Sequence, residues 1–114
     1  MKIKNVNDVP GVPMGAEVPG VTKQVLIGPD DGAENFVMRR FTIEPGAHTP
    51  YHRHDWEHET LILEGEGALV TAEGEQPMKP GDMVYVPPGE VHQFRNTASG
   101  TFRILCLVPM KGHS

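Results

Sequence analysis

Apolar residues recur along the chain in short runs that Gly and Pro interrupt. No stretch keeps apolar residues at helical spacing for three turns without meeting a Gly or Pro, so we expect an all-β protein with only single-turn helices. Short strands at roughly 8 to 12 residue spacing favour a sandwich or barrel, in which few strand edges are exposed. The expected strands are rich in Val, Ile, Leu, Phe, Tyr and Thr and span residues 23–28, 35–44, 58–65, 67–74, 82–87, 91–96 and 101–109.

The chain has the size of one domain. Its 114 residues can enclose a single hydrophobic core, and we expect one domain over residues 1–114. Residues 5–22 are dense in Pro and Gly, which predicts an irregular N-terminal arm in front of the first strand.

Charge and hydropathy narrow the expected partners. The formal net charge is −5, and the longest basic cluster is the pair Arg39 and Arg40, so nucleic acid and anionic membranes are not expected partners. No apolar run approaches the ~20 residues that span a bilayer, and residues 1–10 lack the apolar core of a signal peptide. Cys106 is the only cysteine, which excludes an intramolecular disulfide. A cytoplasmic location is the expectation.

The histidines are distributed unevenly. His48, His52, His54 and His58 fall within eleven positions, and His92 lies far downstream. If the segment HRH is extended, His52 and His54 project from one face and can bind one ion together. His58 opens the strand after the connection DWE, and His92 opens the strand 91–96. Up to four imidazoles are therefore expected to meet.

Such a group of imidazoles is a candidate metal site. It suits Mn, Fe, Co, Ni, Cu or Zn better than Mg or Ca, which prefer oxygen ligands. An ion that prefers six ligands keeps two positions for water, O₂ or a chelating substrate. The alternative is that these histidines are exposed or hydrogen-bonded residues without a metal, because the pattern HXH is short and common.

The first histidine segment also resembles the first motif of the cupin superfamily. That motif has a glycine, five residues, HXH, three or four residues, a glutamate, six residues and a glycine. This chain has the same spacing over residues 46–65, from Gly46 through His52 and His54 to Gly65, but His58 replaces the glutamate.

The second segment resembles the second cupin motif, which has a glycine, five residues, PXG, two residues, a histidine, three residues and an asparagine. The chain matches it over residues 81–96, with Gly81, Pro87, Gly89, His92 and Asn96 at the expected positions. The resemblance implies the cupin fold, a double-stranded β-helix or jelly-roll barrel.

The replaced glutamate determines which metal site the resemblance implies. Glu59 would break the spacing to Gly65 and point to the opposite face of the strand, and Glu57 on the connection is the weaker alternative. The implied ligands are therefore His52, His54, His58 and His92. Small manganese-binding cupins with four histidines carry HPWEH where this chain has HDWEH. Manganese is the first candidate, iron the second, and Zn, Ni, Co or Cu remain open.

Strand alternation suggests what surrounds the ion. Phe94, Ile104 and Cys106 are expected to line an apolar pocket. Cys106 is either a packed small hydrophobe or, as the minority interpretation, a ligand or redox residue. Arg40 could reach a carboxylate in the pocket, and His48 is expected at its rim.

Two functions are compatible with these features, and no residue is assigned as catalytic. The first is a metal-dependent, dioxygenase-like oxidoreductase that acts on a small organic substrate. The second is a non-catalytic module that binds a small molecule or sugar beside a structural metal, with a metal-dependent isomerase or decarboxylase as a further alternative. Leu61 and Leu63 form an apolar outer face, and the resemblance implies a two-fold homodimer.

Overall fold

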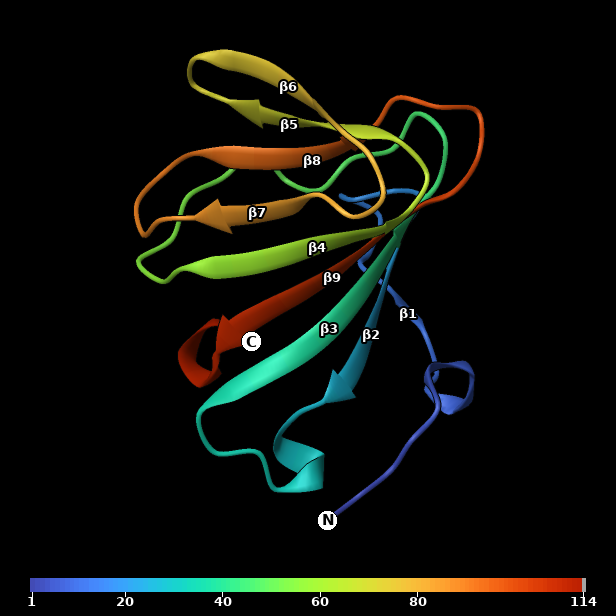
Figure 1. Cartoon of the computed structure of the whole chain (residues 1–114), viewed down its shortest axis with the longest axis vertical. Coiled ribbons are helices and arrows are strands. Elements are labelled where there is room, and N and C mark those ends of the chain that lie inside the picture. The colour runs from blue at the N-terminus through green and yellow to red at the C-terminus, as the bar shows by residue number, and fades with distance from the viewer. Residues whose placement is uncertain (114) are drawn as a thin grey trace.

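Two antiparallel sheets face each other in the computed structural model, which describes residues 1–113 (Figure 1). The larger sheet contains, in spatial order, β1 (Val12–Pro13), β2 (Val21–Ile27), β3 (Phe36–Ile43), β9 (Phe102–Pro109), β4 (His58–Glu64) and β7 (Met83–Val86). The smaller sheet contains β6 (Gly74–Met78), β5 (Gly67–Thr71) and β8 (His92–Asn96). This arrangement confirms the predicted all-β jelly roll.

The core lies between the two sheets because the inward positions of the strands are apolar. Buried and partly exposed residues alternate along β9, and nearly the same alternation occurs in β3, its antiparallel neighbour. Phe94 and Met78 reach the same core from the smaller sheet. The largest fully buried side chains are Phe102, Ile43, Ile62, Ile104, Val37 and Val108.

Two strands depart from the expected pattern. The expected strand 67–74 is a hairpin, in which β5 ends at Thr71 and β6 begins at Gly74. Strand β6 has little β-forming sequence and contains Pro77, which is tolerated because β6 is an edge strand. The N-terminal arm contributes the two-residue strand β1. In residues 1–113 the helices are the single 3-10 turns η1 (Val6–Asp8), η2 (Pro29–Asp31) and η3 (Met110–Gly112), as expected.

The segment between β3 and β4 runs along β8 and brings the two histidine motifs together. The Thr49 amide donates to the Phe94 carbonyl at 2.9 Å. His52 and His92 then exchange backbone hydrogen bonds, with N–O distances of 3.2 and 3.0 Å. This pairing places His52 directly opposite His92 although they are distant in the sequence.

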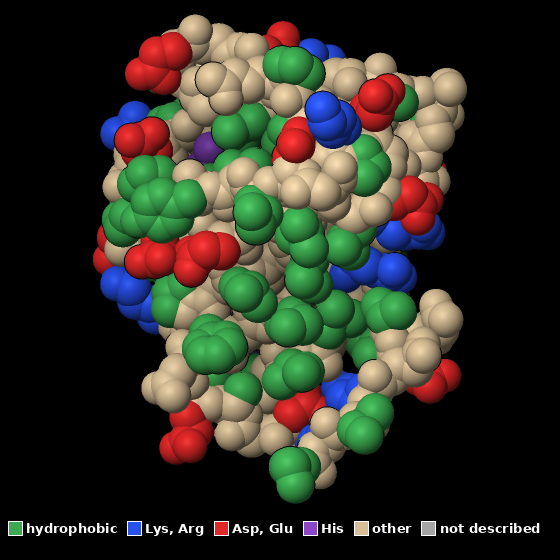
Figure 2. All heavy atoms as spheres, in the orientation of Figure 1, with side chains coloured by type: hydrophobic (Ala, Val, Ile, Leu, Met, Phe, Trp, Pro, Cys, Tyr) green, Lys and Arg blue, Asp and Glu red, His purple; other side chains and the backbone are tan. Residues whose placement is uncertain are grey.

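The outer face of the larger sheet carries several exposed apolar side chains. Apolar side chains gather over this face in Figure 2, and the exposed residues on its strands include Leu61, Leu63, Met83 and Tyr85. The expected two-fold homodimer stays a prediction. None of the helices in residues 1–113 has the length and apolar character needed to cross a membrane.

Candidate metal centre

The four predicted ligands come from three parts of the fold. His58 is the first residue of β4 and His92 the first residue of β8, as expected. His52 and His54 lie in the connection before β4, where His52 makes only an isolated bridge to His92. The segment HRH is thus not a regular strand, although His52 and His54 do lie in one cluster. Backbone pairing with β8 positions this segment instead.

The imidazole rings converge despite their different origins. Potential ligand nitrogens of His52, His54 and His92 all lie within 4.8 Å of one another. His58 Nε2 lies 2.6 Å from His54 Nε2, and the His58 ring centroid is 5.2 Å from that of His92. Nitrogens about 2.1 Å from a shared ion and at right angles would be ~3.0 Å apart. The spacing of His52, His54 and His92 therefore suits a transition metal, whereas His58 lies outside that mutual group and adjoins it through His54.

Hydrogen bonds at Nδ1 orient three of the four imidazole rings. His54 Nδ1 lies 3.2 Å from the Trp56 carbonyl oxygen, and His92 Nδ1 lies 2.9 Å from the Glu90 carbonyl oxygen. His58 Nδ1 lies 3.0 Å from Cys106 Sγ. When Nδ1 carries the proton and donates it to these acceptors, Nε2 keeps its lone pair for a metal. The indole of Trp56 also stacks on the His54 ring, with centroids 4.3 Å apart and planes at 5°.

Electrostatics favour the neutral, metal-binding form of His52, His54 and His58. Burial lowers the pKa of His58 to about 3, and repulsion from His54, His92 and Arg39 acts in the same direction. Burial also lowers the pKa of His52 and His54, with repulsion from His92 as a further cause. Neutral imidazoles are the form that binds a metal. The donor chemistry of the site therefore fits a transition-metal ion.

A cavity of about 160 Å³ adjoins the four histidines. Phe94, Ile104 and Cys106 line it, as expected. Further lining residues that the sequence analysis did not identify are Met14, Lys23, Arg39, Phe41, Thr49, Pro50, Trp56 and Gly112. The signal that could have found Arg39 and Phe41 is strand alternation in β3, which places both on the face of Val37.

The expectation for Arg40 was wrong. Because neighbouring residues of a strand point to opposite faces, Arg39 lines the cavity and Arg40 does not. Arg40 Nε donates to Gln24 Oε1 at 2.7 Å, and the Gln24 amide in turn donates to the Val6 and Val9 carbonyls of the N-terminal arm.

His48, Glu57 and Glu59 lie outside this cavity. His48 is exposed and also absent from the cavity lining, with Nδ1 3.2 Å from Gln93 Nε2. Glu57 and Glu59 are exposed and line a different hollow beside Trp56. Neither carboxylate belongs to the histidine cluster in the described chain.

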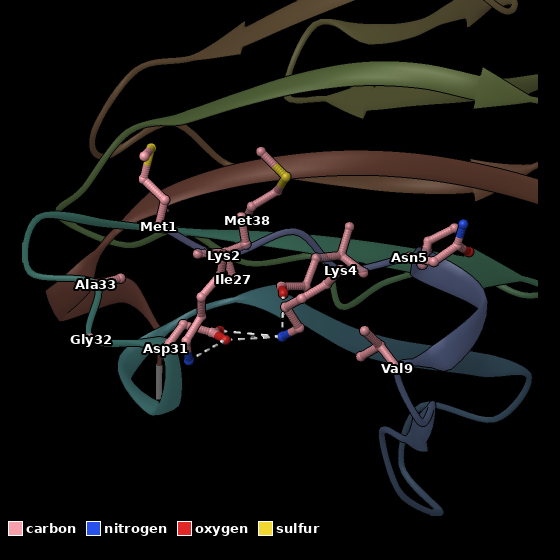
Figure 3. A pocket seen from close by; sticks show the side chains of 12 residues that line it. Met1, Lys2, Lys4, Asn5, Val9, Ile27, Asp31, Gly32, Ala33 and Met38 are labelled. Atoms are coloured by element: carbon pink, nitrogen blue, oxygen red, sulfur yellow. Dashed lines mark hydrogen bonds and ion pairs between the residues drawn. The ribbon is translucent and has the colours of Figure 1, made fainter.

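A larger hollow, of about 590 Å³, lies between the N-terminal arm and η2 (Figure 3). Its single lining carboxylate, Asp31, is 3.3 Å from Lys2 Nζ and 3.1 Å from Lys4 Nζ. Because this carboxylate already binds two cations and no histidine lines the hollow, its lining offers no metal site.

Comparison with known proteins identifies the family. Residues 39–108 match the model of the cupin domain, and the chain belongs to this family. The solved structure of the polyketide cyclase RemF from Streptomyces resistomycificus is 34% identical, with a TM-score of 0.90 over 96% of this chain and 80% of that one.

Two curated relatives have different activities. The 1-methylthio-D-xylulose 5-phosphate methylsulfurylase of Rhodospirillum rubrum is 33% identical over 77% of this chain and 55% of its own length. The gentisate 1,2-dioxygenase of a Ralstonia species is 44% identical over 43% of this chain and 14% of its own length. The chain thus spans about half or less of these relatives, and their different activities do not specify the reaction of this chain.

Proposed function

We propose that this cupin is a metal-dependent, dioxygenase-like oxidoreductase that acts on a small organic substrate. In this proposal His52, His54, His58 and His92 hold one divalent ion, with manganese the first candidate and iron the second. Zinc, nickel, cobalt and copper also suit imidazole ligands. The location we propose is the cytoplasm.

The observation that carries the proposal is the convergence of four imidazoles at a cavity without carboxylates. The residues that line the cavity include no Asp or Glu, so no carboxylate general base faces a substrate there. When bound, the ion would supply Lewis-acid and redox chemistry. The protein's own contribution is to orient the imidazoles through their Nδ1 partners and to surround the substrate with apolar walls.

Those apolar walls favour an organic substrate. Phe41, Phe94 and Ile104 are almost fully buried and line the cavity on the side of the core. Such walls exclude water and favour an apolar body. Partial similarity to a dioxygenase supports the oxidoreductase, whereas the methylsulfurylase and the cyclase show that related cupins have other activities.

Oxygen consumption tests the proposal. The protein is loaded with Mn or Fe and supplied with a panel of diketones and phenols in an oxygen electrode. We expect at least one substrate to give turnover above free metal at the same concentration, and turnover to be lost in His92→Ala. His48→Ala is the matched control, since it removes an exposed histidine outside the cavity and should retain activity.

Absence of turnover with every compound, while the protein still binds one ion per chain, would contradict the oxidoreductase. The non-catalytic binding function would then be favoured. Failure to bind any metal after reloading would contradict the metal site itself.

A further inference from the structure

Arg39 is a buried cation in the wall of the metal cavity. Its exposed fraction is 7%, and its position on β3 turns it toward the interior. One terminal nitrogen, Nη2, donates to Cys106 Sγ at 3.4 Å, and the guanidinium carbon lies 5.0 Å from the centroid of the Phe41 ring. The Nε–H group is buried and has no hydrogen-bond partner in the described chain.

No acidic side chain compensates this charge. The ion pairs of residues 1–113 do not include Arg39, and neither Asp nor Glu lines the cavity. A buried charge without a counter-charge is costly, as is a buried donor without an acceptor. Arginine remains protonated, so it cannot lower this cost by losing its proton. An anion in the cavity would satisfy both the charge and the free donor.

Lys23 strengthens the preference for an anion. It lines the same cavity from β2, and burial together with repulsion from Arg39 lowers its pKa. Lysine and arginine offer donors and no acceptors in their charged forms. The cavity is therefore lined by two basic side chains as well as by the histidines.

We propose that Arg39 binds the carboxylate of a small organic acid, which is the substrate or ligand of this cavity. This inference rests on the proposed function, because it names the class of molecule that the metal cavity would take. A guanidinium can bind a carboxylate through two parallel hydrogen bonds, and here the free Nε–H provides one donor.

Cavity size and lining favour a carboxylate on a compact apolar body. The volume of about 160 Å³ is below the ~300 Å³ at which pockets for drug-sized ligands begin. Phe41, Phe94 and Ile104 provide the apolar contacts. Phosphate sites commonly use a helix N-terminus or a glycine-rich loop, whereas strands and one connection supply most of this lining.

Calorimetric titration with benzoate, its neutral isostere benzamide and inorganic phosphate tests this inference. The titrations use the full chain, both loaded with Mn and after chelation of the metal. We expect benzoate to bind about tenfold or more tightly than benzamide, because a hydrogen bond to a charged group has a larger net effect. The preference should persist without the metal, because Arg39 rather than the ion provides it.

Substitutions test whether Arg39 causes the preference for benzoate over benzamide. Arg39→Gln should reduce benzoate affinity about tenfold or more and leave benzamide affinity within twofold. Arg40→Gln is the matched control on the adjacent position and should leave both affinities unchanged. Arg39→Lys, which retains the charge, is measured beside Arg39→Gln. Circular dichroism establishes that each variant is folded.

Equal binding of benzoate and benzamide by the wild-type protein would overturn the inference without any variant. So would benzoate binding that Arg39→Gln leaves intact, or a preference for phosphate over benzoate. These results are independent of oxygen consumption, so the failure of the anion site and the failure of the oxidoreductase are distinguishable.

Discussion

The amide of Gly89 donates a hydrogen bond to the carbonyl of His54 across 2.7 Å. Gly89 adopts a φ of 82°, a left-handed conformation that other residues rarely adopt, and it lies three residues before His92. The turn before β8 is therefore attached to the connection that carries His54. Together with the backbone pairing of His52 and His92, this bond holds the two histidine motifs in a fixed relationship.

Replacement of His58 tests the fourth ligand. We expect His58→Ala to lower the metal-to-chain ratio measured by elemental analysis, because its Nε2 lies 2.6 Å from that of His54. Glu57→Gln and Glu59→Gln are the controls and should retain the metal, since both side chains are exposed and do not line the histidine cavity, whereas His58 does. If His58→Ala kept its metal content and either glutamate variant lost metal, that carboxylate would be the ligand in place of His58.

Cys106 offers a test of the orientation of His58. Loss of a hydrogen-bond partner behind a metal-binding histidine typically weakens metal affinity about 10- to 100-fold. We expect a decrease of that size in Cys106→Ala, measured by competition with a chelator, because Sγ lies 3.0 Å from His58 Nδ1. Cys106→Ser keeps an acceptor at this position and should recover part of the affinity. Equal affinity in the wild type and Cys106→Ala would leave Cys106 as a packed core residue only.

The contact between Gly112 and Trp56 should fix the position of the Trp56 indole, which stacks on His54. A Cβ added at Gly112 would clash with the Trp56 indole, most closely with Nε1, so Gly112→Ala must displace the indole or the turn η3. We expect a loss of about 1–3 kcal/mol in the free energy of unfolding, measured with urea. Trp56 is the only tryptophan, so its fluorescence should shift as well.

Gly100→Ala is the matched control for this substitution, because a Cβ there meets nothing within 4 Å. It should leave the fluorescence and the unfolding free energy nearly unchanged. An unaltered emission spectrum in Gly112→Ala would show that the contact does not fix the indole.

Acid should loosen the N-terminal arm through Asp31. Hydrogen bonds from the Gly28 amide and Lys4 lower the pKa of Asp31 from 3.8 to about 2. Because the folded state favours the ionised carboxylate, this stabilisation is present above pH 3.8 and is lost as the pH falls toward 2. The protection factor of the Gly28 amide, which compares its exchange rate with the intrinsic rate at the same pH, should therefore fall over this interval.

In Asp31→Asn the Gly28 amide should be less protected from exchange at neutral pH, and its protection should depend little on acid. In Asp30→Asn the Gly28 amide should behave as in the wild type. If the Gly28 amide of Asp31→Asn showed the same pH dependence of exchange as the wild type, the Asp31 carboxylate would be excluded as the cause of that dependence.

Much of the fold could be predicted from the sequence because its signals are local. Gly and Pro mark the strand ends, and alternation in β4, β8 and β9 correctly predicted the buried faces around His58, Phe94 and Cys106. Strand β6 was missed because its sequence contains Gly, Pro and polar residues, and pairing with β5 gives it its structure.

The sequence by itself determined the spacing of the histidines and the inward face of each strand, because both follow from order along the chain. Only the tertiary structure decided that the loop HRH faces β8, since hydrogen bonds to a distant strand hold it there. It also decided that the inward face of β3, which carries Arg39, lines the same cavity as the histidines. Pairing of β3 with β9, and of β9 with β4, brings this face beside His58, and such pairing depends on contacts between segments far apart in the chain.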